Sequence, residues 1–191
     1  MPKLSDPDTW LTQYGDALYR HAFARLHDPM AAEEMVQETL LGALKARDRY
    51  AGEASEKTWL FGILKHKIID YLRKAVREQP HNDETVSFDA LLENSFDERG
   101  HWKSGVSSWR EPDKALEQTH FWNVLEDCVS RLPQRLSSLF ALRELDGLDS
   151  HEICNILDIS STNNLWVMLS RMRLRLRQCL DVNWFGHEER I

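Results

Sequence analysis

The sequence predicts an all-α protein with two small helical domains joined by a long connector, the C-terminal domain being a helix-turn-helix. Towards both ends of the chain, apolar side chains recur every three or four positions, which is the spacing of one helix face. No segment shows the strict apolar–polar alternation of a β-strand. Residues 78–112 lose the periodicity and are rich in proline, glycine, serine and acidic residues. We therefore expect domains at residues 1–77 and 113–191, separated by an acidic connector at 78–112.

Two helices are predicted on either side of Asp28 and Pro29. An aspartate is a good N-terminal cap, and proline is tolerated at the first helical position. The first helix is expected at residues 7–27 and the second from Pro29 to about Arg47. The residues expected to face inward are Leu11, Tyr14, Leu18, Ala22, Leu26, Met35, Val36, Leu40, Ala43 and Leu44.

A third helix is predicted at residues 58–77, after a loop at residues 50–55. Its apolar positions, from Trp59 to Leu72, follow helical spacing. Its other positions carry Lys65, His66 and Asp70, followed by further basic residues. This third helix is therefore expected to bury one face and to present a polar face to solvent.

The net charge of −7 argues, taken alone, against nucleic-acid binding. The charge is unevenly distributed, however, because residues 78–117 hold ten acidic and four basic residues. Basic residues gather in residues 57–77, with six against one acid, and in residues 171–177, with four arginines and no acid. These two segments supply the local positive potential that DNA binding needs.

The C-terminal domain is predicted to contain a short capped helix followed by a turn and a longer helix. Helices are expected at residues 113–130 and 133–145, ended by Asp146 and Gly147. Asp149, with Glu152 three positions later, forms a capping box for a short helix ending near Leu157. After a turn at 158–160, a last helix runs from residue 161 or 162 to beyond Leu180. This order is that of a helix-turn-helix.

The second helix of such a unit lies in the major groove of DNA, with its first residues toward the base edges. The candidate base-reading residues are Thr162, Asn163, Asn164 and Trp166. Ser170, Arg171 and Arg173 follow one or two turns later and are suited to phosphate contacts. One alternative is that residues 161–177 are an ordinary amphipathic helix with a solvated arginine face. Separately, Trp166 could belong to the core instead of reading bases.

The three cysteines, Cys128, Cys154 and Cys179, are few and odd in number, which favours a reducing compartment over a disulfide framework. Cys128 and Cys154 lie among apolar positions and are expected in the core. The cysteines lack metal-ligand spacing, so a zinc or redox sensor is disfavoured and no metal or cofactor is expected. The N-terminus lacks an apolar signal core and no run of 18 apolar residues occurs, so we expect a cytoplasmic protein without membrane insertion.

Two segments together resemble one family, the extracytoplasmic-function (ECF) sigma factors of the sigma-70 family of bacterial RNA polymerase. The first segment, at residues 28–74, is similar to sigma region two, and the second, at residues 132–180, is similar to region four. The residues that carry the resemblance in region two are Ala32 to Leu40, including Val36-Gln37-Glu38, then Gly52, Lys57-Thr58-Trp59-Leu60, Ile63 and Asp70-Tyr71-Leu72-Arg73. In region four they are Leu132-Pro133, Phe140, Leu145 to Leu148, Glu152-Ile153, Leu157, Ile159-Ser160 and Ser170 to Arg177.

The resemblance implies a partner for the second helix and a DNA segment for the third. The second helix would dock on the β′ coiled coil of the polymerase core through Glu34, Gln37, Glu38 and Leu41. The loop and third helix would hold the melted minus-10 promoter element, through Tyr50, Lys57, Lys65, His66, Lys67, Asp70 and Arg73. Trp59 is expected in the core rather than in this set, and Glu56 stands where the family often has an apolar or aromatic residue.

Region four would read the minus-35 element as duplex and contact the β flap of polymerase. The resemblance implies no catalytic residue, because polymerase carries out the chemistry. Anti-sigma proteins are common partners in the family, and the sequence identifies none for this chain. This chain departs from the family at residues 163–168, where members often have a lysine or arginine.

Three other classes of protein are weighed against this one. A stand-alone helix-turn-helix regulator would have no need of Val36-Gln37-Glu38 followed by Lys57-Thr58-Trp59-Leu60. A purely structural protein would leave the two basic segments and the capped short helix without a role. An enzyme has no support, since the sequence shows no nucleophile–base pair, phosphate loop or carboxylate constellation.

Overall fold

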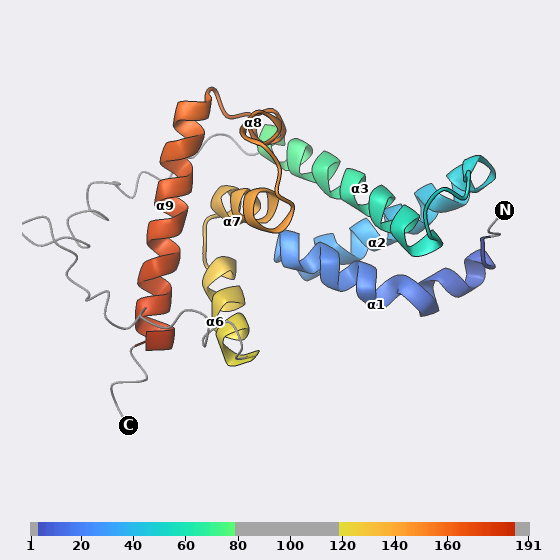
Figure 1. Cartoon of the computed structure of the whole chain (residues 1–191), viewed down its shortest axis with the longest axis horizontal. Helices are drawn as coiled ribbons and strands as arrows, with labels where there is room; N and C mark the ends of the chain where they lie inside the picture. Colours follow the sequence, from blue (N-terminus) through green and yellow to red (C-terminus); the bar gives the residue numbers. More distant parts are fainter. Residues whose placement is uncertain (1–3, 79–118, 186–191) are drawn as a thin grey trace, which may run out of the picture.

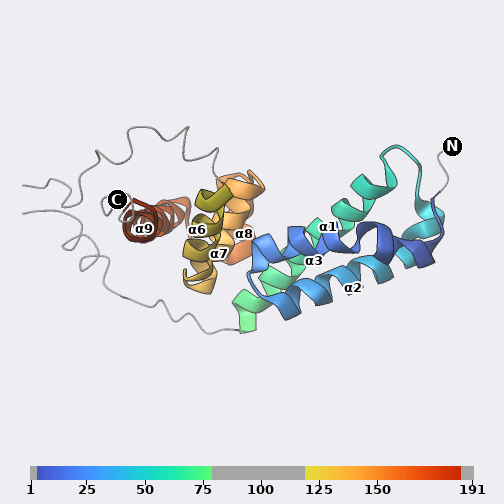
Figure 2. The same cartoon turned by 90° about the horizontal axis from the view of Figure 1, so that it is seen from below.

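The computed structural model describes residues 4–78 and 119–185, and within these residues it contains helices and no strand. Figures 1 and 2 show the helices in two groups that lie side by side. The first group is α1 (Pro7–Leu26), α2 (Pro29–Ala46), the 3-10 turn η1 (Arg47–Arg49) and α3 (Glu56–Glu78). The second is α6 (Thr119–Ser130), α7 (Gln134–Phe140), η3 (Ala141–Leu145), α8 (Ser150–Leu157), α9 (Thr162–Leu180) and η4 (Asp181–Phe185). The all-α prediction is confirmed for these residues, whereas the predicted connector and the start of the helix at 113–130 lie outside them.

The ends of α1 and α2 are fixed by local hydrogen bonds that the sequence predicted. The Asp28 carboxylate accepts hydrogen bonds from the backbone N–H groups of Met30 and Ala31, at 2.9 and 3.2 Å. Pro29 occupies the first position of α2, where its missing N–H costs nothing. His27 ends α1 in the left-handed conformation, with φ of 53°. The chain therefore reverses sharply and lays α2 against α1.

The core of the first group is built from Trp10, Leu18, Leu60 and Leu64, each at most 1% exposed. Two predicted inward residues are not there: Leu11 is 62% exposed and Leu44 is 51% exposed. In each case the preceding residue, Trp10 or Ala43, takes the inward position. Adjacent helical residues point about 100° apart, so a one-residue change of the buried stripe turns the next side chain to solvent.

The second group confirms the predicted caps and turns. The Asp149 carboxylate accepts from the backbone N–H of Glu152 at 2.9 Å, and the Glu152 side chain accepts from the N–H of Asp149 at 3.1 Å. Gly147 and Asp158 both have the left-handed backbone, with φ of 65° and 49°. Ser161 caps α9 by accepting from the N–H of Asn164 at 3.2 Å. Residues 150–180 therefore follow the predicted order of short helix, turn and long helix.

A disulfide between Cys128 and Cys179 joins α6 to α9, although the cysteine count predicted no disulfide framework. Cys128 is buried, as predicted, but it is bonded rather than free. Cys154 is the free cysteine among the described residues, and burial raises the pKa of its thiol. The prediction was wrong because cysteine counts say nothing about which helices pack together. These two residues are 51 positions apart, yet their Cα atoms lie 5.8 Å apart.

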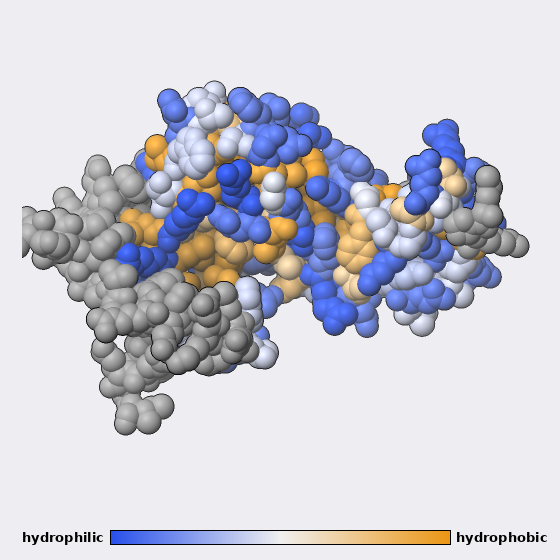
Figure 3. Space-filling view, in the orientation of Figure 1, coloured by the Kyte–Doolittle hydropathy of each residue, from blue (hydrophilic) through white to orange (hydrophobic). Residues whose placement is uncertain are grey.

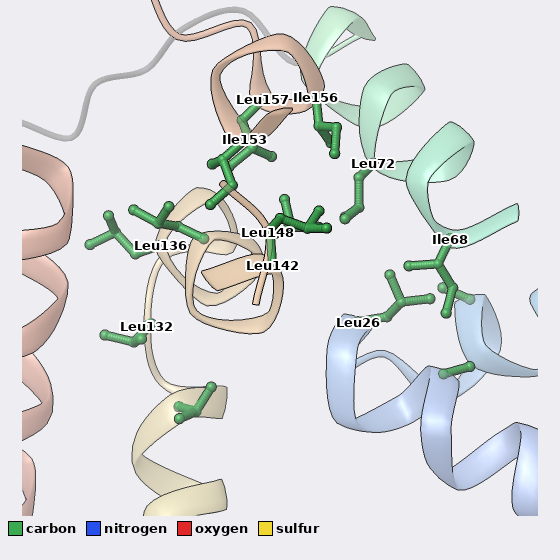
Figure 4. Packing of buried hydrophobic residues seen from close by; sticks show 14 of the residues in the cluster. Leu26, Ile68, Leu72, Leu132, Leu136, Leu142, Leu148, Ile153, Ile156 and Leu157 are labelled. Carbon is green, nitrogen blue, oxygen red and sulfur yellow. The ribbon is translucent and has the colours of Figure 1, made fainter. Parts of the chain in front are cut away.

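The two groups of helices share an apolar contact. Figure 4 shows Leu72 of α3 pointing toward Leu142 and Leu148, with Ile156 of α8 beside it. All four of these side chains are at most 8% exposed. The space-filling view shows hydrophobic residues in orange among blue hydrophilic ones on the surface of this region (Figure 3). Because this contact removes apolar area from water, it stabilises the two groups against each other.

An ion pair closes the edge of the same contact. The Arg25 guanidinium donates to Oδ1 of Asp146 from Nε at 2.9 Å and from Nη2 at 2.6 Å. The side chains of Arg25 and Asp146 are 11% and 10% exposed. His21 lies one turn before Arg25, and its ring stands perpendicular to that of Phe61 at 5.1 Å. Burial, helped by the charge of Arg25, lowers the pKa of His21 to about 4.

Candidate nucleic-acid and partner interfaces

The outer face of α2 presents the four residues predicted to bind polymerase. Glu34, Gln37, Glu38 and Leu41 follow spacings of three and four residues, so they share one side of the helix. Glu34 and Gln37 are exposed, and Leu41 is 51% exposed although it is apolar. Leu44, which was predicted to face inward, is equally exposed one turn further on and extends this face. The result is an acidic face with two exposed leucines.

Glu38 links this face to α3. The ammonium group of Lys67 lies 2.8 Å from the Glu38 carboxylate, and this hydrogen bond lowers the pKa of Glu38. The pair lies in a groove between α2 and α3 whose lining residues include Glu34, Tyr71 and Lys74. Glu38, predicted to bind polymerase, and Lys67, predicted to bind the minus-10 element, therefore pair with each other in the chain by itself.

The loop before α3 carries an aromatic cluster. The ring centroid of Trp59 lies 5.1 Å from that of Tyr50 and 6.1 Å from that of Trp10. Trp10 is buried, whereas Tyr50 and Trp59 are half-buried, so the cluster reaches from the core to the surface. The Tyr50 hydroxyl donates to the carbonyl of Ala54, which holds the loop against itself. Trp59 was expected in the core, and the structure places it at the edge of the core.

Glu56, the first residue of α3, has a structural role that its sequence position did not reveal. Its carboxylate accepts hydrogen bonds from the backbone N–H of Ser5 at 2.5 Å and from the Ser5 hydroxyl at 2.7 Å. Burial acts to raise the pKa of Glu56, but the hydrogen bonds from Ser5 and Tyr14 outweigh burial, so the pKa lies below its ordinary value. Glu56 thus ties the start of α3 to the segment before α1, beside the aromatic cluster.

The remaining predicted minus-10 residues lie along α3. Lys57, Lys65, His66, Asp70 and Arg73 are exposed. Arg73 pairs with Asp70 at 3.4 Å, and the Lys57 ammonium lies 5.9 Å from the centroid of the Phe61 ring. His66, Asp70 and Arg73 share one side of the helix because their spacings are four and three. The structure brings these three together, while Lys67 is turned toward α2.

On α9 the predicted base-reading residues lie at the capped start of the helix. Asn163 and Asn164 are exposed, Thr162 is half-buried, and Trp166 is 49% exposed. Leu165, Met168 and Leu169 are buried on the opposite side. Trp166 is therefore a surface residue, which removes the alternative that placed it in the core.

The three predicted phosphate-binding residues differ in their surroundings. Ser170 is exposed, and its hydroxyl donates to the carbonyl of Trp166 at 2.9 Å. Arg173 is exposed and pairs with Glu144 of η3 at 3.1 Å. Arg171 is half-buried. Phosphate would therefore compete with Glu144 for the Arg173 guanidinium.

Within residues 4–78 and 119–185, no three histidine, cysteine, aspartate or glutamate side chains are grouped as metal ligands. None of the helices in that part of the chain has the length and apolar character needed to cross a membrane.

The fold and these faces define a class: an all-helical protein with one acidic, leucine-bearing helix face and a separate acid-free helix carrying four arginines. Comparisons with known proteins agree with this class. A family profile described as sigma-70 region 2 matches residues 10–78. A probable RNA polymerase sigma factor of Haemophilus influenzae is 35% identical over 179 residues, which cover 91% of this chain and 89% of that protein.

Two further sigma factors and one solved structure are also similar. The RNA polymerase sigma factor YlaC of Bacillus subtilis is 27% identical, covering 94% of this chain and 93% of that protein. The ECF RNA polymerase sigma-E factor of Escherichia coli strain K12 is 30% identical, covering 65% of this chain and 61% of that protein. The structure of the sigma factor RpoE in complex with the anti-sigma factor NepR, from Bartonella quintana, aligns with a TM-score of 0.43. Its sequence identity is 20%, and the alignment covers 94% of this chain and 99% of that one.

This chain belongs to the sigma-70 family, in its ECF group. It is an RNA polymerase sigma factor, with a role in transcription initiation.

Proposed function

We propose that this sigma factor binds core polymerase through α2 and engages two promoter elements with separate parts of the chain. Residues 1–77 act as region two, 78–112 as a connector and 113–191 as region four. The segment from Tyr50 to Arg73 holds the minus-10 element, and α9 reads the minus-35 element. The chain is a regulatory subunit without catalytic residues, and it works in the cytoplasm, where polymerase is.

One observation carries this proposal: separate helices of one chain present the two kinds of face that it needs. The exposed acids and leucines of α2 suit a partner with basic and apolar groups. The exposed asparagines at the start of α9, followed by the half-buried Arg171 and the exposed Arg173, suit a polyanion. A stand-alone DNA-binding regulator would account for α9 but not for the exposed leucines on α2.

The test is run-off transcription with bacterial core polymerase, with and without this protein, on sheared genomic DNA from its source. Discrete start sites that require the protein are expected. Sequences upstream of those starts would then reveal both promoter elements. The absence of any protein-dependent start would overturn the proposal, whatever the affinity of α9 for duplex DNA.

The polymerase-binding face can be tested separately on α2. Glu34→Lys combined with Leu41→Ser should abolish co-purification with core polymerase, since both side chains are exposed on one face. Glu38 is a poor choice, because it pairs with Lys67 and its reversal would disturb the packing of α3. Glu33→Lys is the matched control, an exposed acid one position away on the helix. Normal co-purification of the double variant would remove this face from the interface.

A further inference from the structure

Two apolar side chains stand exposed at the start of α9. Trp166 is 49% exposed and Val167 is 42% exposed, whereas Leu165 and Leu169 beside them are fully buried. Asn163, Trp166, Val167 and Ser170 follow spacings of three and four, so they form one face of the helix. Trp166 and Val167 are therefore not part of the core, and their exposed apolar surface is available for a ligand to cover.

The surroundings of this pair are those of a DNA-binding face. Two arginines follow this pair by one to two turns: Arg171 is half-buried, and Arg173 is exposed and pairs with Glu144. Exposed amide and hydroxyl groups of Asn163, Asn164 and Ser170 flank the pair. The cap made by Ser161 fixes where the helix starts, and with it the direction in which this face points. A polyanion with donors, acceptors and apolar groups on its surface is therefore the partner whose chemistry fits.

The major groove of duplex DNA has such a surface. Each base pair presents donors and acceptors there, and thymine adds its C5-methyl group, which apolar side chains contact. Within this face only Trp166 and Val167 are apolar, so they are the side chains that such methyl groups would meet. Covering one methyl removes apolar area from water and gives about a fourfold gain in affinity.

We propose that Val167, together with Trp166, is a specificity-determining residue that contacts thymine C5-methyl groups in the minus-35 element. The inference rests on the proposed function, in which α9 reads this element. It adds a chemical feature of the promoter: thymines lie opposite Trp166 and Val167, and their methyl groups contribute to promoter selectivity.

The experiment uses holoenzyme, made from core polymerase and the full chain, on a promoter found by run-off transcription. Each thymine of the upstream element is replaced in turn by deoxyuracil, which keeps the base pairing and removes only the methyl group. Affinity is measured by competition at one fixed salt concentration, because phosphate contacts depend on salt. At one or more positions we expect about a fourfold loss of affinity.

Variants of the protein then assign the effect to this pair. With Val167→Ser or Trp166→Ala, thymine and deoxyuracil promoters should bind equally well at the position concerned. Val182→Ser is the matched control for the first variant, since Val182 is exposed but lies in η4, outside this face. It should keep the full preference for thymine. Circular dichroism checks that each variant folds.

Three outcomes would overturn the inference. Deoxyuracil could have no effect at any position, or its effect could persist in both variants, in which case other side chains contact the methyl groups. The variants could also weaken binding to core polymerase while leaving promoter choice unchanged, which would make the pair a protein contact. In each case the wild-type protein still initiates at its promoters, so the proposed function stands. Failure of the proposed function is distinct, because no protein-dependent start would then be found.

Discussion

His21 of α1 shows how the surroundings of one residue make stability depend on pH. Burial and the charge of Arg25 lower the pKa of this histidine to about 4 in the folded chain, from an ordinary value of 6.5. The unfolded chain therefore binds a proton at a pH where the folded chain does not. The stability contributed by neutral His21 is present above pH 6.5 and is lost as the pH falls from 6.5 toward 4.

We predict that His21→Gln reduces the acid sensitivity of the fold. The free energy of unfolding, measured with urea, should fall less between about pH 7 and about pH 5 in the variant than in the wild type. Some sensitivity remains, because burial also lowers the pKa of His27. His151→Gln, at an exposed position of α8, serves as the control. Parallel pH dependence in wild type and His21→Gln would contradict the argument.

A second prediction at the scale of residues concerns Arg171 and Arg173. Replacing both with alanine should weaken binding of holoenzyme to all promoters and lower the salt slope by about two, one for each phosphate contact. If Arg173 stays paired with Glu144 on DNA, the slope should fall by only about one. Arg131→Ala, at an exposed position just after the end of α6, is the control. An unchanged slope would show that neither arginine contacts phosphate.

At the scale of elements, helix ends could be predicted because they depend on neighbouring residues. Asp28 and Asp149 each accept hydrogen bonds from backbone groups within three positions, and both cap their helices as the sequence predicted. The exposed Leu11 and Leu44 were missed because helical spacing cannot say which of two adjacent residues faces the core. The pairing of Cys128 with Cys179 was missed because it needs knowledge of which helices pack together.

We expect Asp149→Ala to destabilise the fold by about 1 kcal/mol, since it removes the cap of α8. Asp149→Asn should cost less, because asparagine is also a good cap. Urea unfolding of the three proteins gives both differences. Asp149 is exposed, and among the described residues its carboxylate accepts hydrogen bonds only from the backbone N–H groups of His151 and Glu152, so the comparison reports on the cap alone. Equal losses in the two variants would show that the capping hydrogen bonds are not the cause.

The disulfide between α6 and α9 gives another prediction. Replacing Cys128 and Cys179 by alanine should lower the free energy of unfolding by about 2–4 kcal/mol, because the bond closes a long loop in the unfolded chain. Adding a reductant to the wild type should have a similar effect and should leave the double variant unchanged. Cys154→Ala should keep the response to reductant. A wild type that is insensitive to reductant would contradict this prediction.

At the scale of the whole molecule, the contact between the two groups of helices could not be predicted from sequence. It joins α1 and α3 to α7, η3 and α8, and its ion pair links residues 121 positions apart. Helical patterns predict each group but contain no information about how the groups meet. The same is true of Glu56, whose partner Ser5 lies 51 positions away. The sequence did predict that most of the candidate interface residues lie on exposed helix faces.

We predict that Arg25→Met loosens this contact. The variant leaves the carboxylate of Asp146 unpaired in a site that is 10% exposed, which is costly for a charge. Separation of the two groups would hydrate the charge, so we expect a larger radius of gyration in X-ray scattering with unchanged circular dichroism. Arg20→Met, at an exposed position of α1, is the control. Exchanging the charges, with Arg25→Asp and Asp146→Arg together, should restore the compact form. An unchanged radius in Arg25→Met would contradict this role of the ion pair.

The ion pair between Arg25 and Asp146 also has a consequence for the way this sequence can diverge. Replacing Arg25 alone or Asp146 alone leaves a nearly buried charge without its partner. Each single change is therefore selected against wherever this packing is kept. Paired changes, to two apolar residues or to exchanged charges, avoid that penalty. Among descendants of this chain that keep the two groups of helices together, the two positions should therefore vary in concert, and they should vary independently in lineages that have lost the contact.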